Sequence, residues 1–293
     1  KEPQKDEVDM IKENQIIYTY LHLAAAKELT EGLIKSKSIN IAYETVTDDK
    51  GRLPLLAPMS AVAGRMSVQA GAHCLEKNQK GRGILLGGAP DGEPANVLIL
   101  GGGVVGENAA IIATGMRAKV HILDKSETRL KQLVQTFGDK IIPEHSDKVD
   151  LNKLVAEADL IVGGVLIPGA EAPKLVTKDM LKLMKRGSVI VDVAIDQGGC
   201  VEGVKPNTHS EPFEIRSGVI VSAIANLPGA VPRTSSIELS TNLQKYVDYL
   251  LVENWFDEYK NNESLRPSLQ IHNGLLLSEE VADSLSLTLS KLV

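Results

Sequence analysis

The middle of the chain alternates short apolar runs with amphipathic stretches. Runs rich in Val, Ile and Leu lie at residues 97–100, 120–123, 160–165, 188–194 and 218–224. Between them, apolar residues recur at spacings of three and four in NAAIIATGMR, SETRLKQLVQTF, DLNKLVAEA and VTKDMLKLMK, the period of an amphipathic helix. Continuous apolar strands separated by such helices indicate a parallel sheet that is covered on both faces. We therefore predict a doubly wound α/β domain over residues 57–230.

The two ends of the chain have a different pattern. We predict strands at Ile16–Tyr20 and Ile39–Val46, which are rich in β-branched and aromatic residues. Between them, LAAAKELTEGLIKS (residues 23–36) has the composition of a helix. Residues 1–56 and 231–293 are accordingly predicted to form a second α/β domain from both chain ends.

Two further helices are predicted around the central domain. Residues 60–79 carry Ala and Gly on all sides, which lets other elements approach closely and predicts a helix buried between the two domains. After Pro232, Ser235 and Glu238 match a capping box, which predicts a helix that starts there and runs to about Asn262. Its apolar residues would fall on one stripe: Leu239, Leu243, Val247 and Leu250.

Composition and charge exclude several classes of function. With 43% hydrophobic residues, the 293-residue chain can bury substantial cores. Its net charge of −6 and scattered basic residues provide no continuous positive track, so we expect no nucleic-acid partner. Apolar runs are too short and too rich in Gly to span a bilayer, which predicts a cytoplasmic protein without membrane contact. The two cysteines, Cys74 and Cys200, form neither a disulfide framework nor a metal-ligand set.

A glycine motif in the central domain indicates a bound dinucleotide. The predicted strand at residues 96–100 runs directly into GGGVVG, a helix follows, and the next strand ends in Asp124. A lone GxGxxG is a weak signal, but this strand-turn-helix context with a following acid is that of a Rossmann-type domain. Gly101 would permit the tight turn, Gly103 would let the backbone approach a pyrophosphate, and Gly106 would let helix and strand pack closely.

The acidic residues at the strand ends carry two further predictions. Asp124 would accept hydrogen bonds from ribose hydroxyls and repel a 2′-phosphate, which favours NAD over NADP. Asp196 is predicted to emerge from its strand near the nicotinamide, whereas Asp192 lies deeper and is expected to hold neighbouring backbone. Ligands of such sheets bind at the carboxyl ends of the strands, which here are Gly101–Gly106, Asp124, Val165, Leu166, Ile195, Asp196, Ala225 and Asn226.

Longer phrases extend along the whole chain. They are KEP (1–3), YLHLAAA (20–26), NIAYETV (40–46), PLLAPMSAVAGR (54–65), ILGGGVVG (99–106), VGGVLIPGAEAPKLV (162–176), VDVAIDQGGC (191–200) and ANLPGAVPRTSS (225–236). In these phrases the sequence resembles the NAD-dependent L-alanine dehydrogenases, a family related to one part of the proton-translocating transhydrogenases. The resemblance implies reversible oxidative deamination of L-alanine to pyruvate and ammonium, with hydride passing between the substrate Cα and the nicotinamide. It also implies a homohexamer.

The resemblance assigns roles to individual residues. Lys1 matches a lysine that contacts the substrate, and His22 and Asp196 match the active-site histidine and aspartate. Deamination needs a base, an acid and a cation that polarises the carbonyl, and these side chains can supply them. No metal is implied. The family's NAD contacts fall on Ser60, Gly103, Val104, Val105, Asp124, Arg129, Ser146, Val165, Leu166, Ile195, Ala225, Asn226 and Leu227.

Two alternatives stay open beside the dehydrogenase. A transhydrogenase-like NAD-binding component shares the two-domain plan, but Lys1, His22 and Asp196 together favour an amino-acid substrate. The other alternative is a non-catalytic NAD-binding protein. Family members carry a segment before KEP with an arginine that holds the substrate carboxylate, so we expect the catalytic domain, as the sequence is written, to lack that contact. The segment is either unrecorded or truly absent.

Overall fold

The computed structural model describes residues 2–165 and 171–291, which belong to two compact units. Unit 1 contains both chain ends, through Met59 and from Arg233 onward, and unit 2 contains most of the chain between Ser60 and Pro232. No helix among the described residues is long and apolar enough to cross a membrane. The roles predicted for the two domains, substrate binding and NAD binding, stay predictions.

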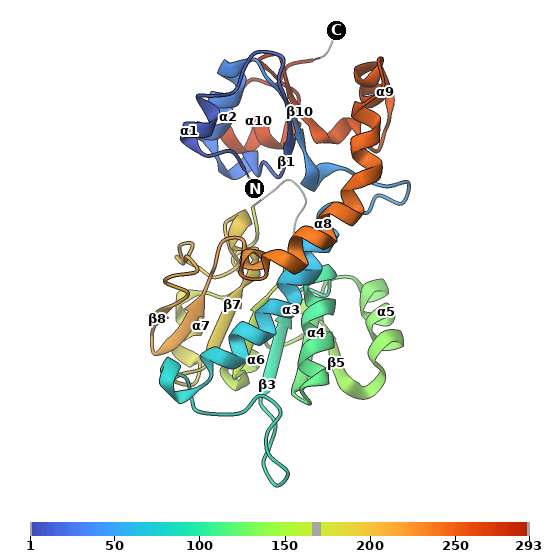
Figure 1. Ribbon diagram of the computed structural model, residues 1–293. Helices are drawn as coiled ribbons and strands as arrows, with labels where there is room; N and C mark the ends of the chain where they lie inside the picture. Colours follow the sequence, from blue (N-terminus) through green and yellow to red (C-terminus); the bar gives the residue numbers. More distant parts are fainter. Residues whose placement is uncertain (1, 166–170, 292–293) are drawn as a thin grey trace. The chain divides into compact units, whose positions relative to one another are not determined.

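Among the described residues, unit 2 contains a seven-stranded sheet (Figure 1). In spatial order its strands are β5 (Ile141–His145), β4 (Lys119–Asp124), β3 (Asn96–Leu100), β6 (Leu160–Gly163), β7 (Val189–Asp192), β9 (Val219–Ser222) and β8 (Glu214–Arg216). All pairs are parallel except β8 with β9 at one edge. Counted along the chain, the parallel strands follow the order 3-2-1-4-5-6 of doubly wound dinucleotide-binding domains. The predicted α/β fold class is confirmed.

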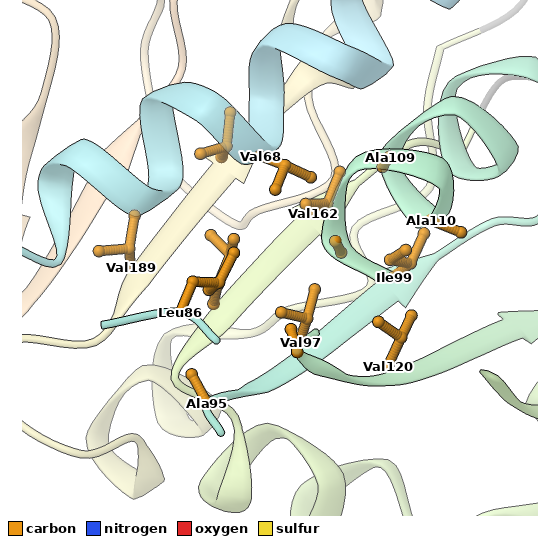
Figure 2. Packing of buried hydrophobic residues seen from close by; sticks show 14 of the residues in the cluster. Val68, Leu86, Ala95, Val97, Ile99, Ala109, Ala110, Val120, Val162 and Val189 are labelled. Atoms are coloured by element: carbon orange, nitrogen blue, oxygen red, sulfur yellow. The ribbon is translucent and has the colours of Figure 1, made fainter. Parts of the chain in front are cut away.

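Helices cover both faces of this sheet because the strand residues alternate between two cores. Val97 and Ile99 of β3 pack into one cluster, and Leu98 and Leu100 pack into the other. Figure 2 shows the first cluster, which α3 and α4 cover. The helices on this face are α3 (Ala57–Cys74), α4 (Val104–Gly115) and α5 (Glu127–Phe137); α6 (Leu151–Glu157) and α7 (Lys178–Leu183) pack into the second cluster.

Glycines let α3 lie close to its neighbours. A Cβ on Gly64 would lie 2.2 Å from the carbonyl oxygen of Val105, and one on Gly71 would lie 2.5 Å from the side chain of Leu160. A larger residue at Gly64 would have to displace the backbone of α4, and one at Gly71 would have to displace the Leu160 side chain. The close approach predicted from the Ala/Gly-rich pattern is therefore confirmed, although the α-helix begins at Ala57 and ends at Cys74.

Unit 1 contains a mixed sheet to which both chain ends contribute. Its order is β1 (Ile16–Thr19), β2 (Ile39–Ala42), β10 (Leu269–His272) and β11 (Leu275–Leu276). β1 and β2 are parallel, and β10 runs antiparallel to both β2 and β11. The helices of this unit are α1 (Lys5–Val8), α2 (Lys27–Ser36), α8 (Pro232–Val247), α9 (Trp255–Asn261) and α10 (Glu279–Leu285).

The structure corrects three predicted features of unit 1. β2 ends at Ala42, and the following residues, which were predicted to extend it, form a 3₁₀ turn. The predicted capping box at Ser235 is wrong because α8 already begins at Pro232, whose fixed φ suits the first position of a helix. The predicted long helix is also divided: α8 ends at Val247, the 3₁₀ turn at Asp248–Leu250 follows, and α9 begins at Trp255.

Short 3₁₀ turns occur in both units. They are η1 (Leu23–Ala25), η2 (Tyr43–Thr45), η3 (Lys77–Gln79), η4 (Gly138–Lys140), η5 (Ser146–Lys148), η6 (Val193–Gln197), η7 (Leu227–Ala230), η8 (Asp248–Leu250) and η9 (Arg266–Ser268).

Candidate functional site

The carboxyl ends of the parallel strands in unit 2 bring the predicted residues to one edge of the sheet. β3 runs into the glycine turn at Gly101, and β4 ends at Asp124. Asp124 is opposite His145 on β5, so Ser146 also lies at this edge. After β3 the chain adds β4 and β5 on one side, and it then returns to add β6 on the other side of β3. Ligands of open α/β sheets bind outside the strand ends at such a switch point. This edge is the candidate site.

The glycine turn leaves an open position in front of α4. Gly101 has a φ of +98°, and a Cβ on Gly106 would lie 1.9 Å from the Gly101 carbonyl oxygen. The outer glycines thus serve the turn and the close packing of helix on strand. By contrast, a Cβ on Gly103 would meet no heavy atom within 4 Å among the described residues. Gly103 is the N-cap of α4, and a helix N-terminus favours an anionic group such as a pyrophosphate.

Side chains of β4 and α5 hold the middle of this turn. Asp124 accepts hydrogen bonds from the N–H of Gly102 through Oδ2 (2.8 Å) and from the N–H of Ser126 through Oδ1 (2.8 Å). Arg129 donates from Nε to the Gly102 carbonyl oxygen (2.6 Å) and from Nη2 to the carboxylate of Glu107. Asp124 therefore holds the N–H of Gly102, and Arg129 holds its carbonyl oxygen. Sequence reasoning did not find Glu107, a half-buried acid in the first turn of the mostly apolar helix α4.

Asp196 lies outside the strand that was predicted to carry it. β7 ends at Asp192, and η6 then carries Asp196. Its exposed carboxylate accepts hydrogen bonds from the N–H of Asn226, at 3.2 Å from Oδ1 and 3.1 Å from Oδ2. Asp196 thus joins the chain after β7 to the chain after β9. Beside it, Ile195 is buried, whereas Ala225 and Asn226 are half-buried.

Asp192 has a different environment, with only 1% of its surface exposed. Oδ1 accepts a hydrogen bond from the N–H of Ala194 (3.1 Å), and Oδ2 accepts from those of Cys200 (2.9 Å) and Val201 (3.1 Å). Burial raises the pKa of Asp192, and these hydrogen bonds act in the opposite direction. The prediction that Asp192 holds neighbouring backbone is confirmed.

In unit 1, His22 lies in a strained turn that Glu44 stabilises. His22 has a φ of +49°, a left-handed conformation that is uncommon for a residue with a side chain. Its N–H donates to Glu44 Oε1 (2.7 Å), and its Nδ1 is 3.9 Å from the same oxygen. Its ring is stacked on Tyr20, with centroids 6.0 Å apart, and Tyr20 donates to the Leu55 carbonyl oxygen (2.6 Å). Burial raises the pKa of Tyr20.

The remaining predicted residues are placed as follows. Ser60 lies in the first turn of α3, and Val165 is half-buried beyond the end of β6. Val104 and Val105 begin α4, and Leu227 begins η7. Lys1 and Leu166 lie outside the described residues. Within the described part of the chain, no three His, Cys, Asp or Glu side chains form a group that could hold a metal ion.

Comparisons with known proteins cover almost the whole chain. The family described as "Alanine dehydrogenase/PNT" matches with its N-terminal domain at residues 1–63 and its C-terminal domain at residues 67–279. The alanine dehydrogenase of Halomonas elongata is 50% identical over 287 residues, which are 98% of this chain and 77% of that protein. That of Methanococcus maripaludis is 50% identical over 283 residues, 96% of this chain and 76% of that protein.

Solved structures agree with these sequence matches. An L-alanine dehydrogenase matches with a TM-score of 0.88 and 44% identity, over 97% of this chain and 79% of the other. A transhydrogenase from Sinorhizobium meliloti matches with a TM-score of 0.75 and 21% identity, over 94% of this chain and 79% of the other. At this lower identity, the second match shows a shared fold alone.

Proposed function

The chain belongs to the alanine dehydrogenase/PNT family, and we propose that it catalyses the reversible oxidative deamination of L-alanine to pyruvate and ammonium with NAD. The observation that carries this proposal is the 50% identity to an alanine dehydrogenase over 98% of the chain. The family description also covers PNT, but the transhydrogenase structure is only 21% identical and shows a shared fold alone. We also propose, from the resemblance alone, a cytoplasmic homohexamer.

The glycine turn of unit 2 fits a dinucleotide cofactor. Gly103 has open space where a pyrophosphate would approach the N-terminus of α4. Asp124 provides a carboxylate that can accept hydrogen bonds from the ribose hydroxyls and repel a 2′-phosphate, which supports NAD over NADP. When bound, NAD supplies a nicotinamide that accepts hydride from the substrate Cα. Ser60, Arg129, Ser146, Val165 and Leu166 complete the proposed contact set.

We assign proton transfer to Asp196 and His22. A base has to neutralise the substrate ammonium and activate water, and an acid has to return protons in the reverse direction. Asn226 holds Asp196 through its backbone N–H, and Glu44 holds the turn at His22. Asn226 thus orients the Asp196 carboxylate, and Glu44 holds the backbone from which the His22 ring extends. Lys1 is proposed to polarise the substrate carbonyl with its positive charge.

A rate comparison tests this function in the full-length protein. One assay follows reduction of NAD by L-alanine, and the other follows hydride exchange between NADPH and NAD without any amino acid. We expect alanine-dependent reduction and no exchange. Exchange without alanine would instead support the transhydrogenase alternative. Binding of NADH with no turnover on any amino acid would support a non-catalytic NAD-binding protein.

A further inference from the structure

Both residues that distinguish NAD from NADP in such domains are present at the glycine turn. An acid at the end of the second strand hydrogen-bonds the ribose of NAD, whereas a nearby arginine accommodates the 2′-phosphate of NADP. Here Asp124 ends β4, and Arg129 lies in the first turns of α5. An arginine at this position would by itself weaken discrimination against NADP. If the protein prefers NAD, another group has to prevent the Arg129 guanidinium from binding the 2′-phosphate of NADP.

The contacts of Arg129 identify what engages it. Its Nε donates to the Gly102 carbonyl oxygen, its Nη1 donates to Gln132 Oε1 (3.2 Å), and its Nη2 donates to the carboxylate of Glu107 on α4. The two side chains are only 27% and 30% exposed, so solvent screens this ion pair less than a fully exposed one. The oxygens of Asp124 accept from backbone N–H groups at 2.8 Å. Of the two acids, Glu107 is thus the one that forms the ion pair with Arg129.

We propose that Glu107 is a specificity-determining residue, which withholds Arg129 from a 2′-phosphate. Preference for NAD would then depend on two carboxylates: Asp124 repels the phosphate, and Glu107 occupies the guanidinium that could bind it. Without Asp124, Glu107 still occupies the guanidinium, and without Glu107, Asp124 still repels the phosphate. Removal of both should release an arginine that binds phosphate well. The proposal rests on the proposed function, because it assumes that NAD binds at this turn.

A double-mutant cycle tests this coupling. Dissociation constants for NADH and NADPH are measured by cofactor fluorescence for the wild type, Asp124→Asn, Glu107→Gln and the double variant. We expect the double variant to gain about tenfold more NADPH affinity than the product of the two single effects, or about 1.4 kcal/mol of coupling. Adding Arg129→Gln to the double variant should abolish the extra gain. Melting temperatures without cofactor report whether each variant is folded.

Glu127→Gln in the Asp124→Asn background is the matched control. Glu127 also lies in the first turn of α5, and its removal changes the net charge equally, but it pairs with Lys148 (2.6 Å). It should produce no coupled gain. The proposal is overturned if effects on NADPH simply multiply, if NADH affinity rises equally, or if the arginine substitution leaves the gain intact. A wild-type protein that binds neither dinucleotide would instead overturn the proposed function.

Discussion

At the scale of single residues, the site shows how environment separates two identical side chains. Asp192 and Asp196 lie four positions apart, yet Asp192 is buried among backbone donors while Asp196 is exposed and accepts hydrogen bonds from Asn226. A buried carboxylate surrounded by N–H groups organises a loop. An exposed carboxylate at the strand ends can take the proton-transfer role that we propose for Asp196.

The two asparagine substitutions should therefore fail in different ways. We expect Asp196→Asn to lose nearly all turnover while NADH affinity and melting temperature stay near those of the wild type. Asp192→Asn presents an amide to backbone N–H groups that need acceptors, which should lower the free energy of unfolding by about 1–3 kcal/mol per unsatisfied group. Kinetics, NADH titration and urea unfolding of both variants check this. Loss of folding in Asp196→Asn would contradict the assignment.

The pH dependence of unfolding provides a second readout for Asp192. Because its pKa is raised above the ordinary 3.8 in the folded state, the folded protein binds this proton more tightly than the unfolded chain. Its contribution to stability is then fully present below pH 3.8 and is lost as pH rises through the raised pKa. Asp192→Asn lacks the titrating group. The stability advantage of the wild type should accordingly shrink over that pH interval.

At the scale of elements, apolar runs predicted the central strands well because strands buried on both faces have continuous apolar sequences. The edge strands β5 and β8 were missed, since IIPEH and EIR are short, polar and half-exposed. The turn that carries Asp196 was mistaken for strand because VDVAI is equally apolar. Periodicity reports burial, and burial alone does not distinguish a strand from a 3₁₀ turn.

Three alanine substitutions in and before α4 separate packing from ligand binding. Gly106→Ala should destabilise the protein, since its Cβ would clash with the Gly101 carbonyl oxygen. Gly103→Ala should fold normally but bind NADH at least tenfold more weakly, because its Cβ would enter the open position. Gly115→Ala is the control: a Cβ there would meet nothing within 4 Å among the described residues, so both the fold and the NADH affinity should stay unchanged. Unchanged NADH affinity in Gly103→Ala would contradict the proposed cradle.

At the scale of the whole molecule, the candidate site residues differ in how well the sequence alone predicts them. The glycine motif and Asp124 follow from local spacing, because one strand-turn-helix unit positions them. His22 was found only through resemblance to a family. Glu44 was missed because its contact with His22 joins residues 22 positions apart, and no spacing rule marks such a pair. Local sequence thus indicates candidate residues within one strand-turn-helix unit more readily than residues that tertiary contacts bring together.

Hydride transfer from the alanine Cα to NAD is the central claim. It is tested most directly by incubating the full-length protein with NAD and L-alanine that carries deuterium at Cα. Mass spectrometry of the reduced cofactor then shows whether the label has moved. We predict that NADH forms and carries one deuterium. NADH without the label, or no reduction by a protein that is folded and binds NADH, would contradict the account.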